Sequence, residues 1–142
     1  MVRVWSRETA TTWTGVPRLL EAIEEALRHG LEDTGERTHV FTHISHVYPH
    51  GANIYTTYLY RLSPDPCESL RRWQTLKTAA SRAIVACGGT ISHQHGVGTD
   101  HLQYLEAEKG ALGMDLLRAL CRTLDPGGIM NPGKLVWQGV GP

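Results

Sequence analysis

Two histidines, His93 and His95, lie two residues apart inside a glycine-rich stretch that runs from Gly88 to Gly98. Glycine lets the backbone adopt positive φ and lets a ligand approach closely, and histidine titrates nearest to neutral pH. The pattern suits acid–base chemistry or the binding of an anionic group. A metal site would need a third ligand from elsewhere, and we expect no metal. A turn whose histidines form only local hydrogen bonds has the same spacing, so that alternative stays open.

Further residues could join this chemistry through the fold. Tyr55 lies in a strand-like stretch, where tyrosine most often packs, but a phenol beside two imidazoles can act as an acid or base. Asn131 and Lys134 could contact a phosphate or a polar ring edge, or could form only a surface turn. His43 and His46 fall on opposite faces of one predicted strand, so we expect at most one of them at any single site.

The apolar pattern predicts a single α+β domain over residues 1–142, an antiparallel sheet with helices packed on one face. Apolar residues three and four apart predict helices, and β-branched and aromatic runs predict an antiparallel hairpin. Residues 1–13 show no clear period and are expected to be irregular or a short strand. The predicted helices are 17–30, 66–87, 100–110 and 116–124, with Asp65 and Asp100 as N-caps, and the predicted strands are 38–48, 52–61 and a short 90–92.

Charge and composition limit the function classes. The 14 basic and 14 acidic residues balance, which argues against a nucleic-acid-binding surface. No apolar run approaches the roughly 20 residues that span a bilayer, and the amino terminus lacks the apolar stretch of a signal peptide. The sequence has three cysteines, Cys67, Cys87 and Cys121. Their number and spacing fit neither a disulfide framework nor a Cys-x-x-Cys metal site. A reducing, cytoplasmic location is therefore expected.

Three stretches of the sequence resemble a known group of flavoenzymes. Residues 88–98 resemble the histidine loop of the alkyldihydroxyacetonephosphate synthase family, and residues 45–55 resemble the strand pair that precedes this loop. Residues 124–135 resemble the carboxyl terminus of the wider FAD-linked oxidases, which include glycolate oxidase and D-lactate dehydrogenase subunits. The resemblance implies the cap, or substrate, domain of such an enzyme.

The resemblance also implies FAD as the cofactor and gives roles to single residues. In the synthase family, a fatty alcohol replaces the acyl group of acyl-dihydroxyacetone phosphate with no net redox change. Tyr55 is then the proton-transferring residue, and His93 and His95 form the histidine cluster. The substrate is a small molecule or a lipid phosphate, with access from a membrane surface for the lipid. The expected flavin contacts are Asn131, Lys134 and Gly96.

One departure from the family pattern leaves alternatives open. The middle histidine of the synthase cluster is Gln94 here, and glutamine forms hydrogen bonds but does not titrate. The hydroxyacid oxidases keep a histidine like His95 and have glycine in place of His93. A 2-hydroxyacid dehydrogenase or oxidase is therefore the first alternative, and a non-catalytic α+β binding module is the second.

The FAD-binding domain of the family, with its glycine-rich pyrophosphate loop, has no counterpart in residues 1–44. We therefore expect the chain to be the carboxyl-terminal part of a longer enzyme, with a tail, residues 125–142, that returns to the flavin. The isolated chain is expected to lack turnover. It is also expected to form a homo-oligomer through an apolar face that lacks its usual partner.

Overall fold

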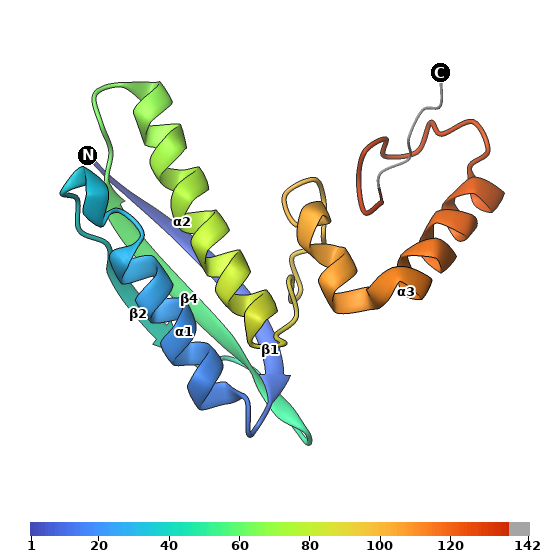
Figure 1. Ribbon diagram of the computed structural model, residues 1–142, viewed down its shortest axis with the longest axis horizontal. Helices are drawn as coiled ribbons and strands as arrows, with labels where there is room; N and C mark the ends of the chain where they lie inside the picture. Colours follow the sequence, from blue (N-terminus) through green and yellow to red (C-terminus); the bar gives the residue numbers. More distant parts are fainter. Residues whose placement is uncertain (137–142) are drawn as a thin grey trace.

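An antiparallel sheet with two helices on one face forms the centre of the molecule (Figure 1). The structure, a computed structural model, describes residues 1–136. The strand order is β1-β4-β2, the short strand β3 also pairs with β4, and these pairings are antiparallel. The α+β prediction is confirmed. The elements are β1 (Val2–Thr12), α1 (Val16–His29), a 3-10 turn (Glu32–Thr34), β2 (His39–His43), β3 (Val47–Tyr48), β4 (Gly51–Arg61), α2 (Pro66–Ala86) and α3 (Leu102–Leu124).

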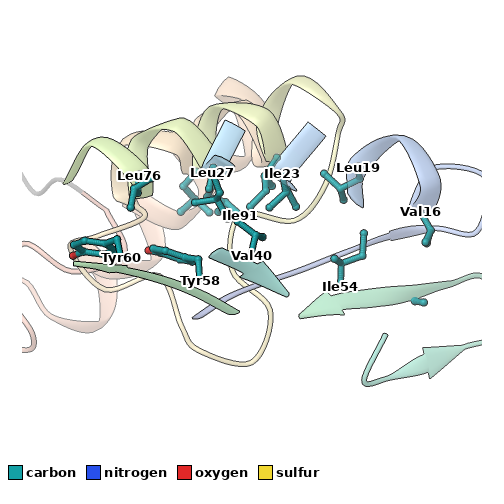
Figure 2. Packing of buried hydrophobic residues seen from close by; sticks show 14 of the residues in the cluster. Val16, Leu19, Ile23, Leu27, Val40, Ile54, Tyr58, Tyr60, Leu76 and Ile91 are labelled. Carbon is teal, nitrogen blue, oxygen red and sulfur yellow. The ribbon is translucent and has the colours of Figure 1, made fainter. Parts of the chain in front are cut away.

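The hydrophobic core lies between the sheet and the two helices α1 and α2 (Figure 2). On α1, the fully buried residues Leu19, Ile23 and Leu27 recur every four positions, as one face of a helix requires. Ile54 and Tyr58 meet them from the helix-facing side of β4. Because side chains alternate along a strand, every second residue between Ile54 and Tyr58 points to the helices. The others point to the opposite side of the sheet, which we call the open face.

The first strand is longer than the sequence indicates. The sequence predicts an irregular segment or a short strand over residues 1–13, whereas Val2–Thr12 pairs with the full length of β4. Both faces of β1 mix polar and apolar residues: Val4 is 58% exposed, while Arg7 is buried. No alternating pattern can therefore reveal this strand, and its long-range pairing partner specifies it instead.

The first strand of the predicted hairpin is divided by a β-bulge. β2 ends at His43 and β3 begins at Val47, and the three residues between them lie opposite only two residues of β4. The extra residue reverses the alternation of faces, so His46 lies on the same open face as His43. The prediction that these two histidines lie on opposite faces is wrong. The cause is the Asn53 side chain, whose Oδ1 accepts hydrogen bonds from the backbone N–H groups of Ser45 (3.1 Å) and His46 (2.6 Å).

The helix α2 begins where the sequence predicts. Asp65 caps it, because its Oδ1 accepts a hydrogen bond from the backbone N–H of Cys67 at 2.9 Å. After α2, however, the predicted strand 90–92 does not form. The backbone N–H of Thr90 donates to the carbonyl of Ala10 at 3.0 Å, and the chain then leaves the edge of β1 without forming a ladder.

The helix α3 joins the two predicted helices 100–110 and 116–124 across a kink. The kink lies at Gly110, whose φ of 69° and ψ of 167° are not helical. Gly110 therefore ends the first helix, as the sequence predicts, although the second begins directly after it. Asp100 does not cap α3: His101 holds the N-cap position, and the Asp100 carboxylate forms an ion pair with α2 instead.

The second half of α3 extends away from the sheet and from α1 and α2 (Figure 1). The sheet face opposite α1 and α2 is also partly uncovered, since Phe41 on β2 and Val4 on β1 are 60% and 58% exposed. In the described part of the chain, no helix is long and apolar enough to cross a membrane. The molecule thus presents an open sheet face beside the segment that follows α2.

Candidate active site

A buried carboxylate, Glu8, is the centre of the candidate site. Glu8 lies on the open face of β1, and its side chain is 2% exposed. His93 Nδ1 donates a hydrogen bond to Glu8 Oε1 at 3.0 Å, and His95 Nε2 lies 3.1 Å from Glu8 Oε2. The structure therefore brings the two predicted histidines together, through an acidic residue that the sequence analysis does not identify.

Two further groups hold the Glu8 carboxylate from β4 and from the bulge. The amide nitrogen of Asn53 donates a hydrogen bond to Glu8 Oε1. His46 Nδ1 lies 3.7 Å from the same oxygen. Because Asn53 Oδ1 also binds the backbone of the bulge, one amide side chain fixes both the carboxylate and His46. A buried carboxylate is stable only with such donors around it.

His93 connects Glu8 to a phenol. Its Nδ1 faces Glu8, and its Nε2 lies 2.8 Å from the hydroxyl of Tyr48. With the proton on Nδ1, Nε2 accepts a hydrogen bond from Tyr48, which completes a chain from carboxylate to imidazole to phenol. Both nitrogens of His93 are thereby engaged. His95, in contrast, has a half-exposed side chain with no hydrogen-bond partner for Nδ1 among residues 1–136, so it can contact a ligand.

The loop that carries both histidines is fixed at its start by close packing. A Cβ added to Gly89 would lie 2.8 Å from both Leu19 Cδ2 and Thr9 Oγ1, so a larger residue there would have to displace these side chains. The next residues bind the edge of β1 through Thr90, and Glu108 on α3 accepts a hydrogen bond from the backbone N–H of Ile91 at 2.8 Å. The loop thus begins from a rigid anchor on three elements.

Tyr55 lies on the same open face as Glu8. The two residues are directly opposite each other on β4 and β1, which places their side chains side by side. The ring of Tyr55 stacks on His43, with centroids 5.2 Å apart. Tyr55 makes no hydrogen bond to His93 or His95, and the phenol in direct contact with the histidine cluster is Tyr48.

A cavity of about 420 Å³ opens at the edge of β1, between α2 and the loop that follows it. Glu8 and His95 line one side of the cavity, together with the predicted cofactor residues Gly96 and Lys134. Asn131, the third predicted flavin contact, does not line it and lies in an exposed turn.

The tail reaches the loop through the backbone N–H of Leu135, which donates to the carbonyl of Gly98 at 3.2 Å. The remainder of the predicted tail, 137–142, lies outside the described residues.

Arg7 supplies a buried positive charge on the opposite wall of this cavity. Its guanidinium donates hydrogen bonds to Ser81 on α2 and to Nε2 of His101. His101 Nδ1 donates to the carbonyl of Gly96 at 3.3 Å, so the imidazole is neutral, with its proton on Nδ1. Burial, reinforced by the charges of Arg7 and Lys77, lowers the pKa of His101. Burial also lowers the pKa of Arg7.

One group of side chains has the arrangement of a metal site. The ligand atoms of Glu8, His46 and His93 all lie within 4.8 Å of one another, and two imidazoles with a carboxylate are a common zinc ligand set. Each of these atoms also has a protein partner, so the same geometry serves a proton-transfer network without a metal.

Four residues of the site are not predicted from the sequence: Glu8, Arg7, Asn53 and Tyr48. Arg7 and Glu8 are two adjacent charges within a run of β-forming residues, and this was the available signal. A charge pair inside a strand places one charge on each face. Asn53 and Tyr48 gave no comparable signal, because their roles depend on the bulge.

A family model described as FAD linked oxidases, C-terminal domain, matches residues 2–135. Alkyldihydroxyacetonephosphate synthase of Caenorhabditis elegans is 32% identical over 133 residues, which cover 92% of this chain and 22% of that protein. The enzyme of the same name from Trypanosoma brucei brucei is 25% identical over 129 residues, 91% of this chain and 21% of that protein. The mitochondrial D-lactate dehydrogenase [cytochrome] of Arabidopsis thaliana is 34% identical over 84 residues, 59% of this chain and 14% of that protein.

Among solved structures, one of alkyldihydroxyacetonephosphate synthase matches with a TM-score of 0.59 and 22% sequence identity. The match covers 94% of this chain and 21% of that one, and it shows a shared fold. The chain spans about a fifth of the length of these synthases.

Proposed function

The chain belongs to the family of FAD linked oxidases, C-terminal domain, and from this premise we propose that it forms the substrate-binding part of an FAD-dependent enzyme. The proposed reaction resembles that of alkyldihydroxyacetonephosphate synthase, in which a fatty alcohol replaces an acyl group. The synthases from several organisms among the relatives support this choice. The substrate would be a lipid phosphate, and a cytoplasmic location with access to a membrane surface is part of the proposal.

The open face of the sheet fits a flavin ring. An isoalloxazine is flat and largely apolar with polar edges, and Val4 and Phe41 give this face exposed apolar surface beside the polar Glu8 cluster. When bound, FAD would supply a ring that accepts electron density from the substrate carbon. Lys134 and Gly96, which line the adjacent cavity, are the proposed contacts to its polar edge, and Asn131 is proposed with them.

The observation that carries the proposal is the buried Glu8 carboxylate with His93 and His95 around it, directly beside Tyr55. A tyrosine next to an organised imidazole cluster can move a proton to and from a substrate carbon. We propose that Tyr55 takes this proton and that the half-exposed His95 donates to the departing carboxylate. His93, whose two nitrogens are engaged, holds Glu8 and Tyr48 in position.

The second candidate is oxidation of a 2-hydroxyacid. The similarity to a plant D-lactate dehydrogenase favours it, as does Gln94, which replaces a titratable residue of the synthase cluster. In that reaction the same groups would remove the hydroxyl proton, and the electrons would pass to the flavin.

The test uses the flavin-loaded enzyme that contains this chain. Incorporation of labelled fatty alcohol into acyl-dihydroxyacetone phosphate, with the flavin colour unchanged, is the expected result. Bleaching of the flavin by D-lactate or glycolate without alcohol exchange would replace the first proposal by the second. If a correctly loaded enzyme carries out neither reaction, both proposed functions are excluded.

The Glu8→Gln substitution tests the site itself. We expect turnover to fall by about 10² to 10⁴, the usual contribution of a positioned acid–base group, with a much smaller effect on thermal stability. Tyr55→Phe and His95→Ala should act in the same direction. Glu106→Gln on the exposed surface of α3 is the matched control and should leave turnover unchanged. If Glu8→Gln lowers turnover only as far as its loss of folded protein explains, Glu8 only supports the fold.

A further inference from the structure

Among residues 1–136, the Arg7 guanidinium forms no ion pair with a carboxylate. Its guanidinium is buried, and its hydrogen bonds go to Ser81 and to His101, which are both uncharged. Its Nε is buried and has no hydrogen-bond partner among the described residues. A buried charge that lacks an opposite charge is costly to the fold. A protein that keeps one at a cavity wall gains stability when an anion enters.

A second cation, Lys77 on α2, lines the same cavity. Its ammonium group pairs with the exposed carboxylate of Asp100 and lies 4.6 Å from the centre of the Trp73 ring. Asp100 thus forms its ion pair with Lys77, whereas Arg7 forms none within the described residues. Lys134 adds a third cation to the lining.

The loop wall adds hydrogen-bond donors. Residues 96–99 line the cavity, and their backbone N–H groups donate no hydrogen bond within the part of the chain that is described. Free backbone donors next to a guanidinium and an ammonium match the oxygens of a phosphate group. A single carboxylate would leave part of this set unused.

From these features we propose that the cavity between β1, α2 and residues 92–101 binds a phosphate group, held by Arg7 and Lys77. Glu8 and His95 line the same cavity, so a bound phosphate monoester would have its carbon end directed to the Glu8 cluster. That orientation depends on the proposed function, whereas phosphate binding itself does not.

The direct probe is inorganic phosphate added to the full chain without flavin. Trp5 and Trp73 line the cavity, so tryptophan fluorescence should change saturably, with a Kd on the order of 1 mM. The Nε–H signal of Arg7 in NMR spectra should shift over the same range of concentration. Methyl phosphate should act like phosphate, and acetate should bind about tenfold more weakly or not at all.

Variants separate binding from folding. Lys77→Gln should raise the Kd for phosphate about tenfold, and Arg7→Gln should abolish binding. Because Arg7→Gln also removes buried hydrogen bonds, the Lys77→Gln result decides the matter if the Arg7 variant does not fold. Lys109→Gln, an exposed change on α3, is the matched control and should bind phosphate like the unmodified chain.

Two outcomes would overturn the proposal. One is an absence of saturable binding, or the same Kd for Lys77→Gln and the unmodified chain. The other is acetate binding as tight as phosphate binding, which would assign the cavity to a carboxylate. If phosphate binds as described but the loaded enzyme shows no alcohol exchange, the proposed reaction fails and the phosphate site stands.

Discussion

At the scale of single residues, the hydrogen-bond partners of His101 keep its imidazole neutral. Its Nε2 accepts a hydrogen bond from Arg7, and protonation would place a second positive charge against the guanidinium. Burial comes first among the causes that lower the pKa of His101 below 6.5, and Arg7 and Lys77 add to it, while Asp100 opposes it. Protonation of this imidazole would therefore break the hydrogen bond between Arg7 on β1 and His101.

This arrangement predicts a pH dependence of stability. The unfolded chain takes up a proton at His101 near pH 6.5, and the native chain resists it. The free energy of unfolding should therefore fall as pH decreases below 6.5, until the lowered native pKa is reached. The slope for one proton cannot exceed about 1.4 kcal/mol per pH unit.

Urea unfolding at several pH values measures this effect. His101→Gln keeps an acceptor for Arg7 but does not titrate, so its stability should depend less on pH between 7 and about 5. His50→Gln in the exposed turn is the matched control and should keep the slope of the unmodified chain. Equal slopes for all three proteins would show that His101 is not held neutral.

The sequence predicted the site histidines but not what organises them. His93 and His95 stood out because their spacing and their glycine frame are local features. Glu8 lies 85 residues from its partner His93 along the chain, and only the pairing of β1 with β4 brings it to Asn53 and Tyr55. Tertiary contacts of this kind leave no periodic signal in one sequence.

At the scale of elements, the bulge between β2 and β3 decides which side chains face the site. One extra residue turns His46 toward Glu8, and the side chain of Asn53 replaces the missing ladder bonds. The helices α1 and α2 were predictable because their apolar stripes and the Asp65 cap are local. The bulge was not, because it depends on hydrogen bonds that its backbone N–H groups donate to the side chain of Asn53 on β4.

Asn53→Ala should therefore disturb both the bulge and the site. The backbone N–H groups of Ser45 and His46 would lose their acceptor, and Glu8 would lose a donor. We expect a loss of about 2–4 kcal/mol in the free energy of unfolding, with faster hydrogen exchange at Ser45 and His46. Thr57→Ala, on the same face of β4, should cost less than about 1 kcal/mol. Unchanged exchange at the two amides would mean that the backbone alone forms the bulge.

At the scale of the whole molecule, the second half of α3, which extends away from the sheet (Figure 1), carries an apolar stripe that the described chain does not cover. The stripe consists of leucines four residues apart with exposures of 74%, 59%, 57% and 79%: Leu112, Leu116, Leu120 and Leu124. The spacing predicted this helix, but a pattern of leucines does not say whether the stripe packs inside or outside. Exposed stripes of this kind mark contact surfaces.

We therefore predict that the isolated chain self-associates through α3. Leu116→Glu with Leu120→Glu should weaken the association by about 3 kcal/mol, roughly a hundredfold in Kd, as measured by sedimentation equilibrium. Ala111→Glu with Ala119→Glu adds the same charge beside the stripe and should have a smaller effect. A chain that is monomeric at high concentration, or that responds equally to both double variants, would contradict this prediction.

The adjacent placement of Arg7 and Glu8 on β1 has a consequence for how the sheet assembles. A shift of this strand by one position along β4 would move the Arg7 guanidinium to the open face of the sheet. The same shift would place the Glu8 carboxylate under α2, beside Ser81. Both charges would then lose their partners in the same step. Two opposite charges in succession therefore disfavour any register in which this strand is displaced by one residue.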